Sequence, residues 1–153
     1  MLATQEYSVI LVGTDGSDQA RDAFKKAMAV ALRNDAKIII ATVIENRLYG
    51  NMGYSLTNAE LLQVETDSAE ELLASYKKMA LDRGLTSVET NLSFGSPKVL
   101  MAEDLPEKFG VDLIMVGQSG LSAVEKLMMG SVSSYIIRHA PCDVLVVRPN
   151  ENE

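Results

Sequence analysis

The chain has 153 residues, a formal net charge of −7 and 47% hydrophobic residues, so we expect one globular domain spanning residues 1–153. No block rich in lysine or arginine offsets the acidic charge, which argues against a general nucleic-acid binder. No apolar run approaches the roughly 20 residues that cross a bilayer, and no secretory leader opens the chain. We therefore expect a cytoplasmic protein that binds neither membrane nor nucleic acid. The single cysteine, Cys142, excludes an internal disulfide and a cysteine cluster for zinc.

The first third of the chain predicts a strand, a helix and a second strand. Residues 7–13 and 37–44 are continuous runs of aliphatic and β-branched side chains, as in parallel strands that are covered on both faces. Between them, Ser17 is a credible N-cap for a helix with one apolar stripe. The stripe is Ala20, Ala23, Phe24, Ala27, Val30 and Ala31.

The middle of the chain predicts a loop, a long helix and an edge strand. Residues 45–56 lack periodicity, and two interpretations stay open: a segment that lies over a ligand, or a long crossover connection. Residues 57–60 have the form of a capping box, and Gly84 is well placed to end the helix that follows. We expect its apolar stripe, from Leu61 to Ala80, to be core. Alternation over 87–94 suits a half-exposed edge strand.

The last third predicts two further helices and two further strands. Ser96 and Pro97 are expected to begin a helix, and Pro106 to kink or stop it near residues 104–105. Residues 113–116 form a buried strand, 132–138 a helix and 144–148 the last strand. Five alternations of strand and helix predict an α/β fold with a mainly parallel sheet.

A glycine-punctuated stretch follows the strand 113–116. Gly117 and Gly120 interrupt it, and the pair Gly130-Ser131 precedes the next helix, with Ser131 as the expected cap. Glycine lets the backbone approach a ligand closely, and a helix N-terminus favours an anion. These are the parts of a phosphate cradle. The alternative is a plain strand-to-helix connection that needs glycines for its turns.

Three segments together resemble the universal stress protein family. They are VILVGTDGS at residues 9–17, the Gly117-x-x-Gly120 and Gly130-Ser131 spacing, and HAPCDVLVVR at residues 139–148. The resemblance covers nearly the whole chain. It implies a three-layer α/β/α sandwich of the adenine nucleotide alpha hydrolase-like type, with a five-stranded parallel sheet of order 3-2-1-4-5. It also implies ATP binding, and a homodimer formed through the last strand, residues 144–147.

The resemblance also implies which residues line the nucleotide site. They are Gly13, Thr14, Asp15, Val43, Val116, Gly117, Ser119, Gly120, Gly130, Ser131, Val132 and Ser133. Phosphates would meet the glycines and serines, and adenine and ribose would lie beside Asp15 and the Val43 backbone. Asp15 could instead be a turn former before Gly16.

Two departures from the family pattern bear on the ligand. Ser119 stands where many relatives have a histidine, and Lys126 is the only nearby cation in the connecting segment 122–126. A divalent cation such as Mg²⁺ is therefore expected to neutralise the triphosphate.

The sequence contains no evident catalytic constellation. His139 lies at a predicted helix end, where a packing or dipole role is expected rather than general-base catalysis. No lysine precedes Ser131, so the Walker pattern is absent. The leading hypothesis is a nucleotide-binding regulatory module of the stress response with little or no ATPase activity. A structural or interaction protein with an unused cleft, and a slow ATPase, are the alternatives.

Overall fold

A computed structural model of the chain describes residues 6–45, 58–119 and 129–149. Its centre is a parallel sheet of five strands in the order β3-β2-β1-β4-β5, which confirms the predicted order. The strands are β1 (Val9–Gly13), β2 (Lys37–Ile44), β3 (Val88–Phe94), β4 (Leu113–Gly117) and β5 (Asp143–Val147). The predicted bounds of the second strand are matched, whereas the first and last strands differ by one or two residues.

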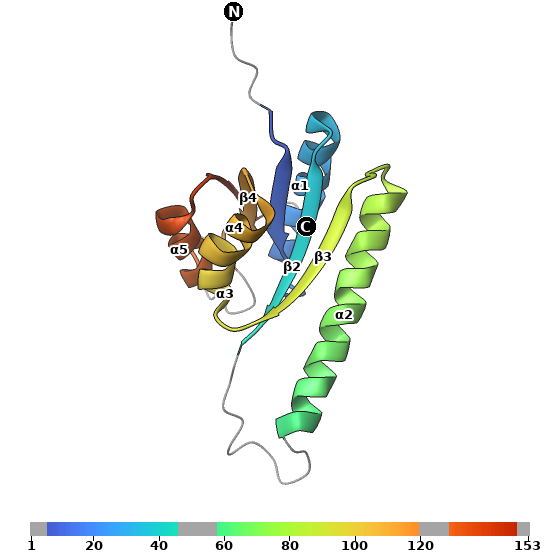
Figure 1. Ribbon diagram of the computed structural model, residues 1–153, viewed down its shortest axis with the longest axis vertical. Coiled ribbons are helices and arrows are strands. Elements are labelled where there is room, and N and C mark those ends of the chain that lie inside the picture. Colours follow the sequence, from blue (N-terminus) through green and yellow to red (C-terminus); the bar gives the residue numbers. More distant parts are fainter. Residues whose placement is uncertain (1–5, 46–57, 120–128, 150–153) are drawn as a thin grey trace, which may run out of the picture.

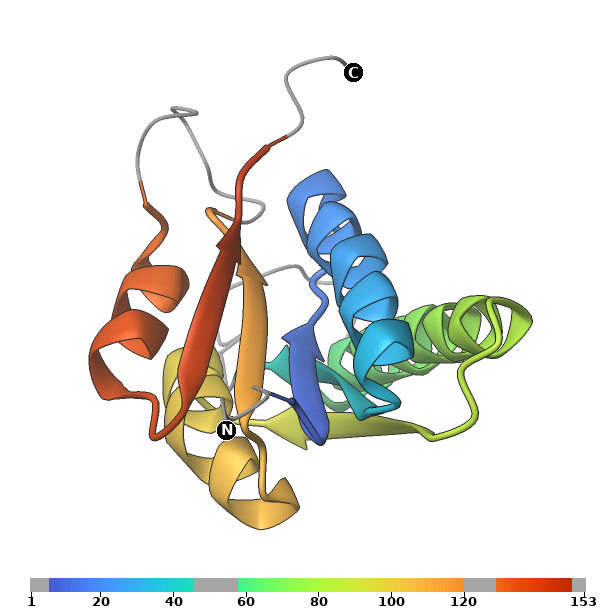
Figure 2. The same ribbon diagram turned by 90° about the horizontal axis from the view of Figure 1, so that it is seen from above.

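Helices cover both faces of the sheet and complete the α/β/α layers (Figures 1 and 2). On one face lie α1 (Asp18–Asn34) and α2 (Asn58–Asp82); on the other lie α3 (Pro97–Val99), the π-helical turn η1 (Leu100–Asp104), α4 (Leu105–Phe109) and α5 (Ser131–His139). Strand side chains alternate between the two faces. Ile10 and Val12 therefore belong to the core layer under α1 and α2, and Leu11 to the layer under the other helices. None of the described helices is long and apolar enough to cross a membrane.

Helix α1 begins and packs as its sequence predicts. The Ser17 hydroxyl accepts a hydrogen bond from the N–H of Ala20 at 3.1 Å, which is the expected N-cap contact. All six residues of the predicted apolar stripe are buried, together with Met28.

Of the two other serines predicted at helix starts, Ser96 is the cap residue of α3, with Pro97 directly after it as predicted, but its side chain makes no capping hydrogen bond. The prediction for Ser131 is wrong. Helix α5 has Gly130 as its cap residue, so Ser131 is its first helical residue instead of the cap. A cap requires the hydroxyl to point back at the first turn, and sequence identity alone does not fix that rotamer.

The chain remains helical past Pro106. The sequence offered two outcomes at this proline, a kink or a stop near residues 104–105, and the stop is wrong. The N–H of Leu105 bonds the carbonyl of Leu100, five residues earlier, and the chain continues through Pro106 to Phe109. Pro106 has no N–H to donate to the preceding turn, and the wider turn just before it accommodates the ring. The sequence located the irregularity correctly, but the π turn accommodates it.

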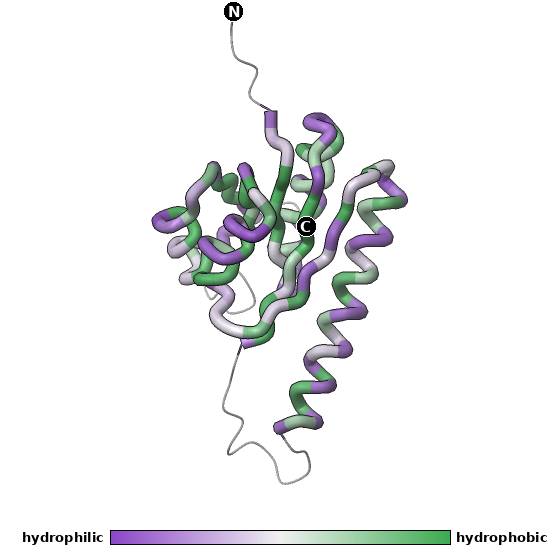
Figure 3. The backbone as a smooth tube through the Cα atoms, viewed as in Figure 1, coloured by the Kyte–Doolittle hydropathy of each residue, from purple (hydrophilic) through white to green (hydrophobic). Residues whose placement is uncertain are grey.

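Helix α2 is only partly core. With 25 residues it is about 38 Å long, well beyond the reach of the strands it covers, so its first turns project past the sheet (Figure 1). Leu62 is 39% exposed, which contradicts the prediction that the whole stripe is core, whereas Leu73 and Tyr76 are buried. Apolar and polar residues accordingly alternate along its projecting end (Figure 3). Gly84, with φ of 98°, follows the helix as predicted, whereas Thr57 of the expected capping box lies outside the described residues.

Candidate functional site

The carboxyl ends of β1 and β4 lie side by side at the centre of the sheet. Val12 of β1 pairs with Met115 of β4, so the residues after Gly13 and after Gly117 emerge next to each other. The chain leaves β1 toward α1 on one face and leaves β4 toward α5 on the other. In open α/β sheets, ligands bind at such a topological switch point.

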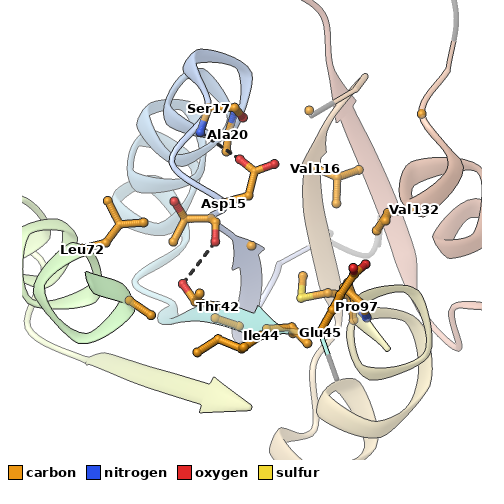
Figure 4. A pocket seen from close by; sticks show the side chains of 18 of the residues that line it. Asp15, Ser17, Ala20, Thr42, Ile44, Glu45, Leu72, Pro97, Val116 and Val132 are labelled. Atoms are coloured by element: carbon orange, nitrogen blue, oxygen red, sulfur yellow. Dashed lines mark hydrogen bonds between the residues drawn. The ribbon is translucent and has the colours of Figure 1, made fainter. Parts of the chain in front are cut away.

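A pocket of about 720 Å³ opens at this edge. Its volume is within the range of small-molecule and cofactor sites. Eleven of the twelve residues predicted for the nucleotide site line it, and Gly120 lies outside the described residues. The eleven are Gly13, Thr14, Asp15, Val43, Val116, Gly117, Ser119, Gly130, Ser131, Val132 and Ser133. Figure 4 shows Val116 and Val132 across the pocket from Leu72 of α2.

Asp15 combines a turn with a place in the pocket wall. Its Oδ1 accepts a hydrogen bond from the N–H of Ser17 at 2.9 Å, a short-range contact typical of an aspartate turn. The residue is exposed and lines the pocket. The turn-forming interpretation of Asp15 therefore holds, and it leaves the carboxylate facing the cavity.

The start of α5 is fixed to the end of β4 by two hydrogen bonds. The N–H of Gly130 donates to the carbonyl of Gln118 at 2.8 Å, and the Ser133 hydroxyl donates to the carbonyl of Gly117 at 2.7 Å. The Ser133 hydroxyl proton is thus used in a bond within the protein, and its expected role toward a phosphate stays a prediction. Ser131, two residues earlier, is exposed at the rim of the pocket.

The glycines are needed for contacts within the protein itself. A Cβ on Gly130 would lie 3.2 Å from the Cα of Ser119, and one on Gly117 would lie 3.1 Å from the backbone oxygen of Gln19. Either distance is shorter than ordinary van der Waals contact, so a side chain at these two positions would crowd the backbone around the end of β4.

Two threonines lie in the buried floor between β1 and β2. The Thr42 hydroxyl donates to the carbonyl of Thr14 at 3.1 Å. The Thr14 hydroxyl is buried, and no hydrogen-bond partner is present for it among the described residues.

Sequence reasoning missed the contribution of α2 and of the segment after β3. Val64, Glu65, Ser68, Ala69 and Leu72 of α2 line the pocket, and so do Pro97 and Met101. Helical periodicity predicted that Ala69 and Leu72 are core. Periodicity identifies the apolar face of a helix, but it does not tell whether that face packs against a strand or lines a cavity. The projection of α2 beyond the sheet was the missing information.

The described part of the lining is acidic. Carboxylates come from Asp15, Glu45 and Glu65, and no lysine, arginine or histidine is among the described lining residues. No group of three or more potential metal-binding side chains occurs in the described ranges. His139 lies at the end of α5, with its ring centroid 4.1 Å from that of Tyr135, which fits the expected packing role.

The fold and the pocket define an α/β sandwich protein with a pocket at the switch point of a parallel sheet. The family model described as the universal stress protein family matches residues 6–148, and the chain therefore belongs to that family. A putative universal stress protein of Staphylococcus haemolyticus is 50% identical over 145 residues, which are 95% of this chain and 87% of that protein.

Solved structures agree with this membership. The universal stress protein UspA from Lactobacillus plantarum superposes with a TM-score of 0.85 at 30% identity, covering 95% of this chain and 100% of that one. A universal stress protein solved in complex with cAMP gives a TM-score of 0.74 at 28% identity, with coverage of 95% and 100%.

Proposed function

We propose that this chain is an ATP-binding universal stress protein, a regulatory module of the stress response whose output depends on nucleotide occupancy. The observation that carries the proposal is the gathering of eleven motif residues, from four separate parts of the sequence, around one pocket. The adenine nucleotide in the cAMP-bound relative supports the ligand class. The absence of an evident catalytic base in the sequence favours little or no hydrolysis.

The two ends of the pocket suit the two ends of a nucleotide. At the rim, α5 begins with Ser131, Val132 and Ser133, whose N–H groups have no acceptor within the helix because they occupy its first turn. Such N–H groups and the positive helix dipole favour phosphate. Deeper in, Val43 and Val116 offer an apolar surface for a base.

The acidic lining makes a metal ion part of the proposal. A triphosphate would meet the carboxylates of Asp15, Glu45 and Glu65 without a described lysine or arginine in the lining. Mg²⁺ is held in proteins by one or two carboxylates together with substrate phosphates, so these residues fit it. The ion would neutralise phosphate charge. ATP titrations with and without magnesium test this step, and equal affinity in both would contradict it.

Nucleotide content and a rim variant test the proposal as a whole. We expect a heated denaturing extract of the purified protein to contain ATP near one per chain. Ser131→Glu should abolish binding of added Mg-ATP, because it places a negative charge beside the phosphates. The fold should tolerate it, since Ser131 is exposed and a carboxylate at a helix N-terminus is stabilising.

A matched control separates the local effect from net charge. Ser87→Glu adds the same charge at an exposed residue just before β3, at the opposite edge of the sheet, and should leave binding unchanged. A wild-type protein that contains no nucleotide and fails to bind Mg-ATP would support the interaction-protein alternative. Linear phosphate release that disappears in Ser131→Glu would support the slow ATPase.

We also propose a homodimer through β5. This strand is an edge of the described sheet, and its outer backbone N–H and C=O groups face no strand there. An apolar edge strand favours pairing with a second copy. Sedimentation equilibrium should give twice the mass of the chain, and a monomer at tens of micromolar would contradict the proposal.

A further inference from the structure

Two small residues of the sheet, Gly13 and Ala41, line the pocket. Gly13 of β1 pairs with Ala41 of β2, and both lie on the face that α5 covers. The residues two positions earlier on the same face, Leu11 and Ile39, are fully buried aliphatic side chains. On this face, β1 and β2 thus change from large aliphatic residues to small ones where they reach the pocket.

The side chain of Met101 extends over Gly13. A Cβ on Gly13 would lie 3.0 Å from the Met101 Cε and 3.5 Å from its Sδ, so the thioether occupies the space that a larger residue would fill. Met101 is 5% exposed and lines the pocket. Its contact with the strand is made by the far end of an unbranched chain, which can change rotamer without moving the backbone.

The backbone that carries Met101 is irregular. Met101 lies in the π turn η1, where the Leu105 N–H bonds the Leu100 carbonyl. A π turn inside a helix widens it by one residue, and such turns occur frequently at functional sites. Here the turn presents Met101 to the pocket between α3, which contributes Pro97, and the buried Leu105.

We propose that Met101 is the residue on which the nucleobase packs, and that its thioether sets the depth of the base subsite. The inference rests on the proposed nucleotide function and assigns the base end of the ligand. A methionine sulfur makes favourable contacts with aromatic rings, and its flexible chain adapts to their substituents. Ala41, Val43 and Val116 belong to the same apolar layer and also line the pocket, whereas the free N–H groups lie at the α5 rim.

Methyl NMR on the wild-type chain tests the contact directly. The chain has eight methionines, and ¹³C-methyl labelling gives one signal for each, with Met101 assigned from Met101→Leu. We expect Mg-ATP to shift the Met101 methyl upfield through the ring current of the base. Magnesium tripolyphosphate, which has no base, should leave it unmoved while shifting Met129, the residue before the cap of α5.

Internal controls make the outcomes distinct. Met28 and Met115 are fully buried in the opposite core layer and should not move. If Mg-ATP shifts Met129 but leaves Met101 unmoved, this inference is overturned and the nucleotide function stands. If Mg-ATP binds nowhere, both are overturned.

A size-exchange experiment tests the subsite depth. Met101→Ala should bind an ATP analogue with a benzyl group on the exocyclic amine about tenfold or more tighter than the wild type does. Met79→Ala is the control, because it makes the same truncation on α2 in the other core layer. It should not change the affinity for the benzyl analogue. An unchanged preference in a folded Met101→Ala that still binds ATP would overturn the assignment of subsite depth to Met101.

Discussion

The side chain of Gln19 accepts a hydrogen bond from the backbone N–H of Ser119, with 2.9 Å between Oε1 and N. The two residues are 100 positions apart in the sequence. Gln19 lies in the first turn of α1, directly after β1, and Ser119 follows β4. The contact therefore joins the segments that follow β1 and β4, and both Ser119 and the β1 end residue Gly13 line the pocket.

Removing this contact should loosen the segment after β4. We expect Gln19→Ala to lower the free energy of unfolding by about 1 kcal/mol, because it leaves a partly buried N–H without its acceptor. Gln19→Glu keeps an acceptor and should cost less. Urea denaturation measures both. Gln63→Ala, which removes an exposed contact to Asp67 on α2, is the control and should be close to neutral. Equal losses in Gln19→Ala and Gln63→Ala would contradict this role.

Two glycines of the site should differ in their tolerance of a methyl group. In Gly117→Ala the new Cβ meets the backbone of α1 at 3.1 Å, and backbone cannot easily move away. We expect a loss of roughly 1–3 kcal/mol from such overpacking. In Gly13→Ala it meets the end of the Met101 side chain, which can rotate, so the loss should be smaller. Thermal unfolding of the two variants side by side measures the difference, and the reverse order would show that Met101 is held rigidly.

The two serines at helix starts on opposite faces form a matched pair. Ser17→Ala should destabilise the protein by about 1 kcal/mol, because the hydroxyl caps α1. Ser17→Asp restores an acceptor and should recover most of the loss. Ser96→Ala should have almost no effect, since that hydroxyl makes no capping bond. Chemical denaturation of the three variants tests the assignment, and a Ser96→Ala as damaging as Ser17→Ala would refute it.

Cys142 should react slowly with alkylating reagents. Burial raises the pKa of its thiol, and the carboxylates of Asp112 and Asp143 raise the pKa further. The thiolate is the reactive form, so the rate with iodoacetamide should rise with pH with an inflection above the ordinary value of about 8.5. The same protein in urea is the control.

The raised pKa of the Cys142 thiol also makes the stability of the protein depend on pH. Because the folded pKa is raised, its contribution to stability is complete below the unfolded pKa and is lost as pH rises through the folded pKa. An inflection in the folded protein at or below that in urea would contradict the burial effect.

The elements that the sequence predicted well are those that depend on local pattern. The sequences of β2 and β4 are almost entirely apolar, and the apolar stripe of α1 has strict helical spacing. The burial of these residues could therefore be predicted from the hydrophobic pattern alone. The strand order came instead from resemblance to a family. The candidate site residues came from the same resemblance, and eleven of them line one pocket. Their roles toward ATP remain predictions.

What the sequence could not decide involves directions and distances between segments. Ser96 and Ser17 are alike in sequence context, yet only the Ser17 hydroxyl points at its helix. The first turns of α2 have an apolar stripe like its last turns, yet they project past the strands and line a cavity.

The sequence by itself determined the alternation of strand and helix and the burial of the strands, because these follow from local periodicity. Only the tertiary structure decided which backbone segments each glycine approaches. It also decided that the Ser133 hydroxyl donates to the Gly117 carbonyl and that the Met101 side chain lies over Gly13. Those are contacts between residues far apart in the chain, and they are fixed by how the layers pack.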